Sequence, residues 1–158
     1  MDVLFLQGWQ AKKTMLNKIS HVILVAAGSG TRLGHTEPKA FVKIKGKEMF
    51  AYSLDLFESM KEIDAVILVA PEHKKDETKK IIEKYGYKKV KHICSGGAER
   101  KDSVLNGLSH IEPLVDNVLI HDAARALIDR QTVLNVLNGL SDYKCAFPYI
   151  PAVDTKKI

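Results

Sequence analysis

The chain has 158 residues, with 24 lysines and arginines against 19 aspartates and glutamates, which gives a formal net charge of +5. This length predicts a single domain, and the content of 46% hydrophobic and 27% charged residues excludes a disordered or collagen-like protein. The basic excess is densest in residues 74–91, where acidic residues interrupt the run and aromatic residues do not interleave at base-stacking spacing. We therefore expect a solvated helix face there and no nucleic acid partner.

Residues 1–18 are expected to form an irregular leader ahead of one domain at residues 19–158. The leader is a poor signal peptide, because it carries an acidic residue at its start and no small-residue cleavage site. The longest apolar run, residues 22–27, is much shorter than the roughly 20 residues of a membrane span, so no membrane partner is expected. Cys94 and Cys145 form no CxxC pair, which favours a reduced, cytoplasmic chain with two core thiols.

Short apolar runs alternate along the chain with segments of helical periodicity. In chain order, the predicted elements are a strand at 22–27, a helix at 47–60, a strand at 65–70, a helix at 73–85 closed by Gly86, a strand at 88–94, a helix at 98–111, a strand at 117–121, a helix at 130–140 and a strand at 145–150. The helix at 98–111 is expected to bury Val104, Leu108 and Ile111, and Pro148 weakens the last strand. The alternation predicts an α/β fold, a Rossmann-like, doubly wound, mainly parallel sheet with helices on both faces.

Ligands of such sheets bind beyond the carboxyl ends of the strands. The loop after the first strand contains only small residues at its start: Ala26, Ala27, Gly28, Ser29 and Gly30. Successive backbone N–H groups in such a turn form a concave anion site that suits phosphate. The loop follows neither the Walker pattern nor the GxGxxG pattern, and the alternative is an ordinary tight connection between strand and helix.

Two cations follow in the same polar loop, Arg32 and Lys39. Arginine offers a planar fork to phosphate oxygens and lysine a point charge, so the pair would stabilise charge on a transferring phosphoryl group. The alternative is that both side chains are merely solvated.

The segment AAGSGTRLG, followed by PKAF and a later GK, resembles the signature loop of sugar-phosphate nucleotidyltransferases. In particular it is similar to the cytidylyltransferase family that acts on 2-C-methyl-D-erythritol 4-phosphate in non-mevalonate isoprenoid biosynthesis. Three further segments resemble later motifs of that family: SGGAERKDSVLNGL at residues 95–108, VLIHDAAR at 118–125 and, more weakly, PAVDTKK at 151–157. The resemblance that these four segments carry extends over residues 19–158.

The resemblance implies a nucleotide site in which Ala26, Ala27, Gly28, Ser29 and Gly30 hold the phosphates of CTP, and Gly97, Ala98 and Ser103 surround the cytosine. It also implies that Asp122 coordinates Mg²⁺ or another divalent cation, and that the acceptor is contacted by Asp122, Ala123, Arg125 and Thr155. The residues alone allow other readings, in which Ser103 caps a helix and Asp122 forms a loop salt bridge with Arg125. Ala126 stands where the family has proline, so a looser loop is expected.

The implied reaction needs no protein nucleophile, because a phosphate oxygen of the acceptor attacks the α-phosphorus of CTP and pyrophosphate leaves. Arg32 and Lys39 would be the catalytic residues that stabilise the crowded charge. His121 is expected to be a structural residue at a strand end rather than a base.

Three hypotheses about function remain open on the sequence. The favoured one is the methylerythritol-phosphate cytidylyltransferase, and the alternatives are a pentitol-phosphate cytidylyltransferase of cell-wall polymer synthesis and an inactive nucleotide-binding fragment. The family's C-terminal portion and most of its dimerisation arm are not in this chain, so the homodimer is an expectation for the full-length family. We also expect an exposed sheet edge and exposed apolar helix faces.

Overall fold

A computed structural model describes residues 18–28 and 37–149, and the predicted leader lies almost entirely outside these residues. Four strands form the main sheet: β1 (Ser20–Val25), β4 (Ala65–Ala70), β5 (Val90–Ser95) and β6 (Asn117–Asp122). Four α-helices accompany them: α2 (Met49–Ser59), α3 (Lys75–Tyr85), α4 (Arg100–Leu108) and α5 (Arg130–Asp142). Two single-turn 3₁₀ helices, η2 (Lys39–Phe41) and η3 (Glu72–Lys74), and a short hairpin of β2 (Lys43–Ile44) and β3 (Lys47–Glu48) complete the described elements.

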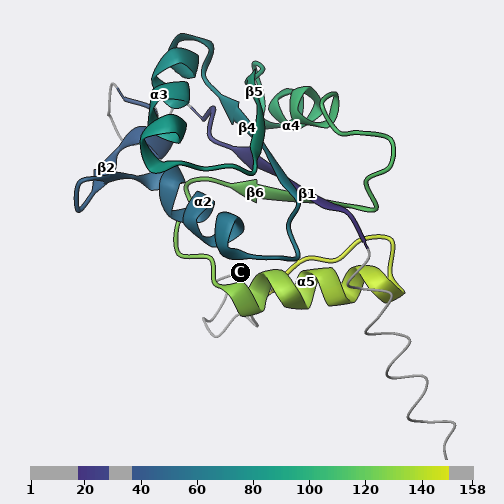
Figure 1. The fold of residues 1–158 in the computed structure, drawn as a ribbon. Helices are drawn as coiled ribbons and strands as arrows, with labels where there is room; N and C mark the ends of the chain where they lie inside the picture. The colour runs from purple at the N-terminus through teal and green to yellow at the C-terminus, as the bar shows by residue number, and fades with distance from the viewer. Residues whose placement is uncertain (1–17, 29–36, 150–158) are drawn as a thin grey trace, which may run out of the picture.

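The main sheet has the strand order β5-β4-β1-β6, and every pair in it is parallel. The chain therefore runs outward from β1 to β5 and then returns to β6 on the other side of β1 (Figure 1). This reversal is the switch point of a doubly wound sheet, the place where such folds bind ligands. The predicted Rossmann-like α/β fold is confirmed.

Both faces of the sheet are covered by helices. On one face, α2, α3 and α5 pack against Val22, Leu24, Val66 and Leu68, while α4 lies on the opposite face over β1, β4 and β5 (Figure 1). All six residues of β4 are buried, as expected for a central strand that is covered on both sides. Among the described residues, no helix is long and apolar enough to cross a membrane.

The prediction for the buried face of the helix at 98–111 was only partly correct, because Val104 and Ile111 are half-buried while Leu108 is exposed. The buried residues of this helix are Ser103 and Gly107, whereas Leu105 and Leu108 are 61% and 39% exposed. Small residues face the sheet because the helix approaches it closely, and a side chain at Gly107 would have no room. The exposed leucines, together with Ile120 on the edge strand β6, which is 47% exposed, match the expected exposure of apolar surface.

Replacing Gly107 with valine is expected to lower the free energy of unfolding by about 2–3 kcal/mol, because a Cβ atom overpacks the core. That atom would lie 2.6 Å from Cγ2 of Ile23 and 3.2 Å from Cγ2 of Val69. Urea denaturation measures the change. Leu105→Val in the same helix is the control, with an expected change within about 0.5 kcal/mol, and equal effects of the two substitutions would contradict the close approach of α4.

Two further predictions at the end of the chain were wrong. Residues 145–149 form no strand, and Phe147 and Tyr149 are 76% and 80% exposed. Pro148 removes a backbone donor from this run, so its apolar composition alone does not pair it with the sheet. Cys145 is exposed rather than a core thiol, although Cys94 is buried as expected.

The hairpin of β2 and β3 was not predicted. Its turn consists of Lys45 and Gly46, both with positive φ, at 50° and 81°, and Ile44 pairs with Lys47 across it. This geometry is typical of a two-residue type I′ turn. By contrast, the predicted end of α3 at Gly86 is confirmed, because this glycine has a left-handed conformation with φ of 72°.

Candidate functional site

The turn after β1 lies directly against the turn after β5. Ala26 is buried and donates a backbone hydrogen bond to the carbonyl of Val69 over 2.8 Å, which ties this turn to the neighbouring strand. A Cβ atom at Gly96 would lie only 2.2 Å from Cβ of Ala27, so a glycine is needed for the two turns to meet. The first and second predicted motifs are therefore brought together at the carboxyl edge of the sheet.

The end of the described part of this turn is open. Gly28 is exposed, and no atom of the described residues lies within 4 Å of a Cβ atom built on it. Packing within the described part of the chain therefore does not require a glycine here. The predicted residues Ser29, Gly30 and Arg32 follow at once and lie outside the described residues.

The second motif folds back on the start of α4. The hydroxyl of Ser103 accepts a hydrogen bond from the N–H of Gly97 over 3.0 Å, and Ser103 is 4% exposed. The N-terminus of α4 is capped by other residues, because Glu99 and Asp102 form a reciprocal capping box. Ser103 therefore supports the glycine turn rather than capping the helix, and it leaves Gly97 and Ala98 exposed beside it.

The third motif begins where β6 ends beside β1. Asp122 is the residue paired with Val25, and Ala123 is fully buried and donates its N–H to the carbonyl of Val25 over 2.9 Å. This bond places the carboxylate of Asp122 next to the turn that starts at Ala26. The side chain of Asp122 is 31% exposed, so a ligand at this edge can reach it.

Two guanidinium groups contact the carboxylate of Asp122. Nε of Arg100 donates to Oδ1 over 2.9 Å, and Nε of Arg125 lies 3.7 Å from Oδ2. The Asp122–Arg125 pair agrees with the loop salt bridge considered from the sequence. Arg100 was missed, although it lies inside the second motif at the first residue of α4. Its contact joins the second motif to the third.

Lys39 lies on a turn in which the adjacent residues are buried in the core. Lys39 is exposed, while Pro38, Ala40 and Phe41 are buried, so the backbone is fixed to the core and the ammonium group faces solvent. Within the described residues no hydrogen bond or ion pair joins Lys39 to the three motifs above. Thr155, the remaining predicted contact, lies outside the described residues.

His121, the residue before Asp122, is held in the interior. Its Nε2 lies 3.1 Å from the hydroxyl oxygen of Ser53, and its ring meets the ring of Phe57 edge-on with centroids 5.6 Å apart. Burial lowers the pKa of His121, so the ring is neutral at pH 7. The arrangement supports a structural role in which His121 fixes the end of β6 against α2.

His121→Phe is expected to lower the free energy of unfolding by about 1–3 kcal/mol, because it leaves the Ser53 hydroxyl buried without a partner. Ser53 is fully buried. The double variant Ser53→Ala with His121→Phe should recover part of this loss in urea denaturation, since it removes both polar groups. Strictly additive effects of the two substitutions would show that the hydroxyl and the ring do not depend on each other.

Asp122 is the carboxylate among the described residues that could hold a metal ion at this edge. The described residues contain no group of three or more histidine, cysteine, aspartate or glutamate side chains placed to hold an ion. Mg²⁺ is commonly held by one or two carboxylates together with substrate phosphates, so Asp122 suits an ion that arrives with a nucleotide.

A cavity of about 1200 Å³ lies between the loop after β6, α5 and the segment that follows α5. Arg125, Thr132 and Asn135 contribute polar groups to its lining, and Tyr143, Phe147 and Tyr149 contribute aromatic ones. Gly28, Gly96 and Gly97 do not line it. The cavity is therefore distinct from the described glycine turns, although His121, Ala124 and Arg125 of the third motif line it.

The fold and these motifs define a Rossmann-like nucleotidyltransferase domain. A family model described as 2-C-methyl-D-erythritol 4-phosphate cytidylyltransferase (IspD) matches residues 20–158, and the chain belongs to this family. It is 40% identical over 137 residues to the 2-C-methyl-D-erythritol 4-phosphate cytidylyltransferase of Clostridium botulinum strain 657, covering 87% of this chain and 60% of that protein. It is 37% identical over 138 residues to that of Clostridioides difficile strain 630, covering 87% and 58%.

Solved structures agree with the sequence comparisons. The 4-diphosphocytidyl-2C-methyl-D-erythritol synthase of Anaerococcus prevotii superposes with a TM-score of 0.66 at 30% identity, covering 78% of this chain and 52% of that one. The chain thus spans about 60% of the length of the curated relatives that it matches.

Proposed function

We propose that this chain supplies the CTP-binding and catalytic part of a cytidylyltransferase that converts CTP and 2-C-methyl-D-erythritol 4-phosphate to 4-diphosphocytidyl-2-C-methyl-D-erythritol and pyrophosphate. The observation that carries the proposal is the meeting of three motifs at one sheet edge. Ala27 lies against Gly96, and Arg100 reaches from the second motif to Asp122 in the third. Membership of the family supplies the substrates, and its matches favour this acceptor over a pentitol phosphate.

In this proposal the nucleotide occupies the sheet edge. The turn from Ala26 to Gly30 receives the phosphates, as successive N–H groups in such a turn do, and Gly97, Ala98 and Ser103 form the wall toward the cytosine. Ser103 acts by holding the N–H of Gly97 in place over 3.0 Å. Asp122 holds Mg²⁺, which when bound neutralises charge on the nucleotide phosphates.

The chemical step transfers the cytidylyl group between two phosphates. A phosphate oxygen of the acceptor forms a bond to the α-phosphorus of CTP, and the bond from that phosphorus to the oxygen bridging to the β-phosphate breaks, so that pyrophosphate leaves with the electron pair. Arg32 and Lys39 stabilise the charge that accumulates at the α-phosphate. Asp122, Ala123, Arg125 and Thr155 orient the acceptor, whose phosphate is attracted by the guanidinium of Arg125.

The assembly and the compartment belong to the same proposal. Resemblance to the family supports a homodimer for the full-length protein, and a cysteine usage without pairs supports a cytoplasmic location. Sedimentation of a full-length form and the distribution of a tagged protein test these two points.

Calorimetric titration with CTP and Mg²⁺ tests the nucleotide site, with UTP, GTP and ATP as controls. Selective binding of CTP is expected, and release of pyrophosphate on addition of 2-C-methyl-D-erythritol 4-phosphate then tests catalysis. Binding of CTP without turnover would identify the chain as an inactive nucleotide-binding fragment. Equal binding of all four nucleotides, or of none, would contradict the proposed site.

A further inference from the structure

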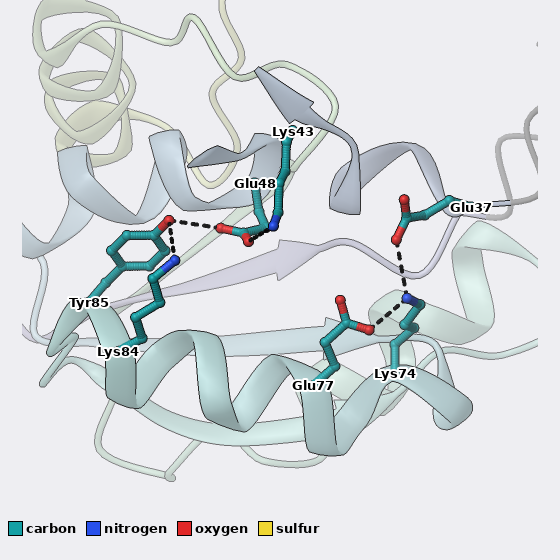
Figure 2. A network of polar contacts seen from close by, with 7 residues as sticks. All are labelled: Glu37, Lys43, Glu48, Lys74, Glu77, Lys84 and Tyr85. Atoms are coloured by element: carbon teal, nitrogen blue, oxygen red, sulfur yellow. Dashed lines mark hydrogen bonds and ion pairs between the residues drawn. The ribbon is translucent and has the colours of Figure 1, made fainter. Parts of the chain in front are cut away.

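Helix α3 is fastened to both ends of the segment formed by residues 37–48. At one end, Nζ of Lys74, which immediately precedes α3, lies 3.2 Å from Oε1 of Glu37. At the other end, the hydroxyl of Tyr85, the last residue of α3, donates to Glu48 over 2.9 Å. Figure 2 shows these two contacts at opposite ends of the helix. The segment between them carries Lys39.

Lys74 contacts the segment on both sides of Lys39. Besides Glu37, its ammonium group lies 5.5 Å from the centre of the Phe41 ring, within the range of a cation–π interaction. Its position is set by Glu77, one turn along the chain, at 2.6 Å (Figure 2). The Lys74 side chain is only 19% exposed, so it packs between these groups instead of extending into solvent.

The turn that carries Lys39 depends on its neighbours for its conformation. Phe41 is 2% exposed and packs on Phe50 with ring centroids 5.1 Å apart. The N–H of Phe41 donates to the carbonyl of Pro38 over 2.8 Å, and the N–H of Val42 donates to that of Lys39 over 3.2 Å. A single 3₁₀ turn has little stability of its own, so contacts at its two ends decide how well it is held.

We propose that Lys74 is a positioning residue, which fixes the turn of residues 38–41 and thereby the place from which Lys39 acts. The proposal rests on the proposed function for the role of Lys39. Lys74 itself is engaged by two carboxylates and an aromatic ring, and so it acts through Glu37 and Phe41. Small displacements of a catalytic group are costly, since a misplacement of about 1 Å lowers rates by up to about 100-fold.

Hydrogen exchange measures the positioning without any ligand. In Lys74→Met, which keeps the aliphatic stem and removes the charge, the amides of Phe41 and Val42 are expected to exchange about three- to fivefold faster. Lys74→Arg should restore slow exchange. Lys75→Met is the matched control, because Lys75 is the adjacent residue and pairs only with Glu72, at 3.7 Å among the described residues. Unchanged exchange in Lys74→Met, or an equal change in Lys75→Met, would overturn the proposal.

Glu37→Gln provides a second variant that removes the same contact from the other side. Glu37 is 48% exposed, so this substitution leaves the core intact even if Lys74→Met fails to fold. It should accelerate exchange at the same two amides. If exchange there stays at the wild-type rate, the contact between Glu37 and Lys74 does not hold the turn, and the proposal fails.

Kinetics then separate positioning from stability. In pyrophosphate release from Mg·CTP and 2-C-methyl-D-erythritol 4-phosphate, Lys74→Met is expected to lower kcat about three- to tenfold with KM for CTP changed less than about twofold, because the substitution acts on the alignment of Lys39. Lys74→Arg should recover kcat. Faster exchange with an unchanged kcat would leave Lys74 a purely structural residue and overturn the proposal. Failure of the unsubstituted chain to bind Mg·CTP would instead count against the proposed function, while the exchange experiment still decides whether Lys74 holds the turn.

Discussion

Turnover is expected to fall by about 10²- to 10³-fold when Lys39 is replaced by alanine, the magnitude found when one charge-stabilising donor is removed from an active site. The affinity for Mg·CTP is expected to change less than about threefold, because the lysine acts mainly on charge that develops in the transition state. The structure favours such a separation: the turn at Lys39 is anchored by the buried Pro38, Ala40 and Phe41, so truncating the exposed side chain leaves the backbone in place. Pyrophosphate release and calorimetric titration measure the two quantities.

Lys43→Ala is the matched control for this experiment. Lys43 lies in the same segment, its side chain is 62% exposed, and it pairs with Glu48 at 3.6 Å rather than facing the sheet edge. Its replacement should leave turnover within about twofold of the parent value, as for surface positions away from a site. Equal losses of turnover and CTP affinity in Lys39→Ala would show that the lysine binds ground state and transition state alike, and the catalytic assignment would fail.

The central part of the fold was predictable because its signals are local and agree with one another. The six residues of β4 are apolar and all buried, and only a parallel sheet covered on both faces requires such a run. Gly86 ends α3 with a positive φ, which is the conformation that glycine supplies at a helix end. In these places the local sequence pattern predicts the same structure that the packing of the whole chain requires.

The errors occur where the answer depends on a distant partner. The face of α4 is decided by Ile23, which lies against Gly107, whereas helical periodicity alone selected Val104, Leu108 and Ile111. Residues 145–149 have a strand-like composition, but a strand needs a neighbouring strand with free backbone groups. No strand among the described residues pairs with this segment. Composition describes what a segment can do, whereas pairing is decided by the rest of the chain.

The candidate site shows the same division. Small residues and glycines after the strands were recognised from the sequence, and two of these turns meet as the topology requires, with Gly96 against Ala27. Arg100 was overlooked because arginine at the first residue of an exposed helix usually means solvation. Its significance comes from Asp122, 22 residues later, and no local signal connects the two. The strand order that brings them together was the missing information.

Asp122→Asn is expected to change the binding of CTP in opposite directions with and without Mg²⁺. The amide keeps the size of the side chain but loses the charge that an ion requires, so affinity for Mg·CTP should fall at least about 10- to 100-fold. A loss of this size is typical when a residue that only supports a metal ligand is replaced. Affinity for metal-free CTP should rise, because Arg100 and Arg125, now at 2.9 and 3.7 Å from the carboxylate, lose their counter-ion and remain available to phosphate.

Calorimetric titrations with Mg²⁺ and with a chelator measure both affinities, and Asp142→Asn, on the exposed end of α5, is the control. If the metal titration is unchanged in Asp122→Asn, the ion is bound elsewhere. If the affinities with and without Mg²⁺ both fall, the carboxylate instead stabilises the structure of this sheet edge. Only a carboxylate that holds the ion and also neutralises the two arginines is expected to change the two affinities in opposite directions.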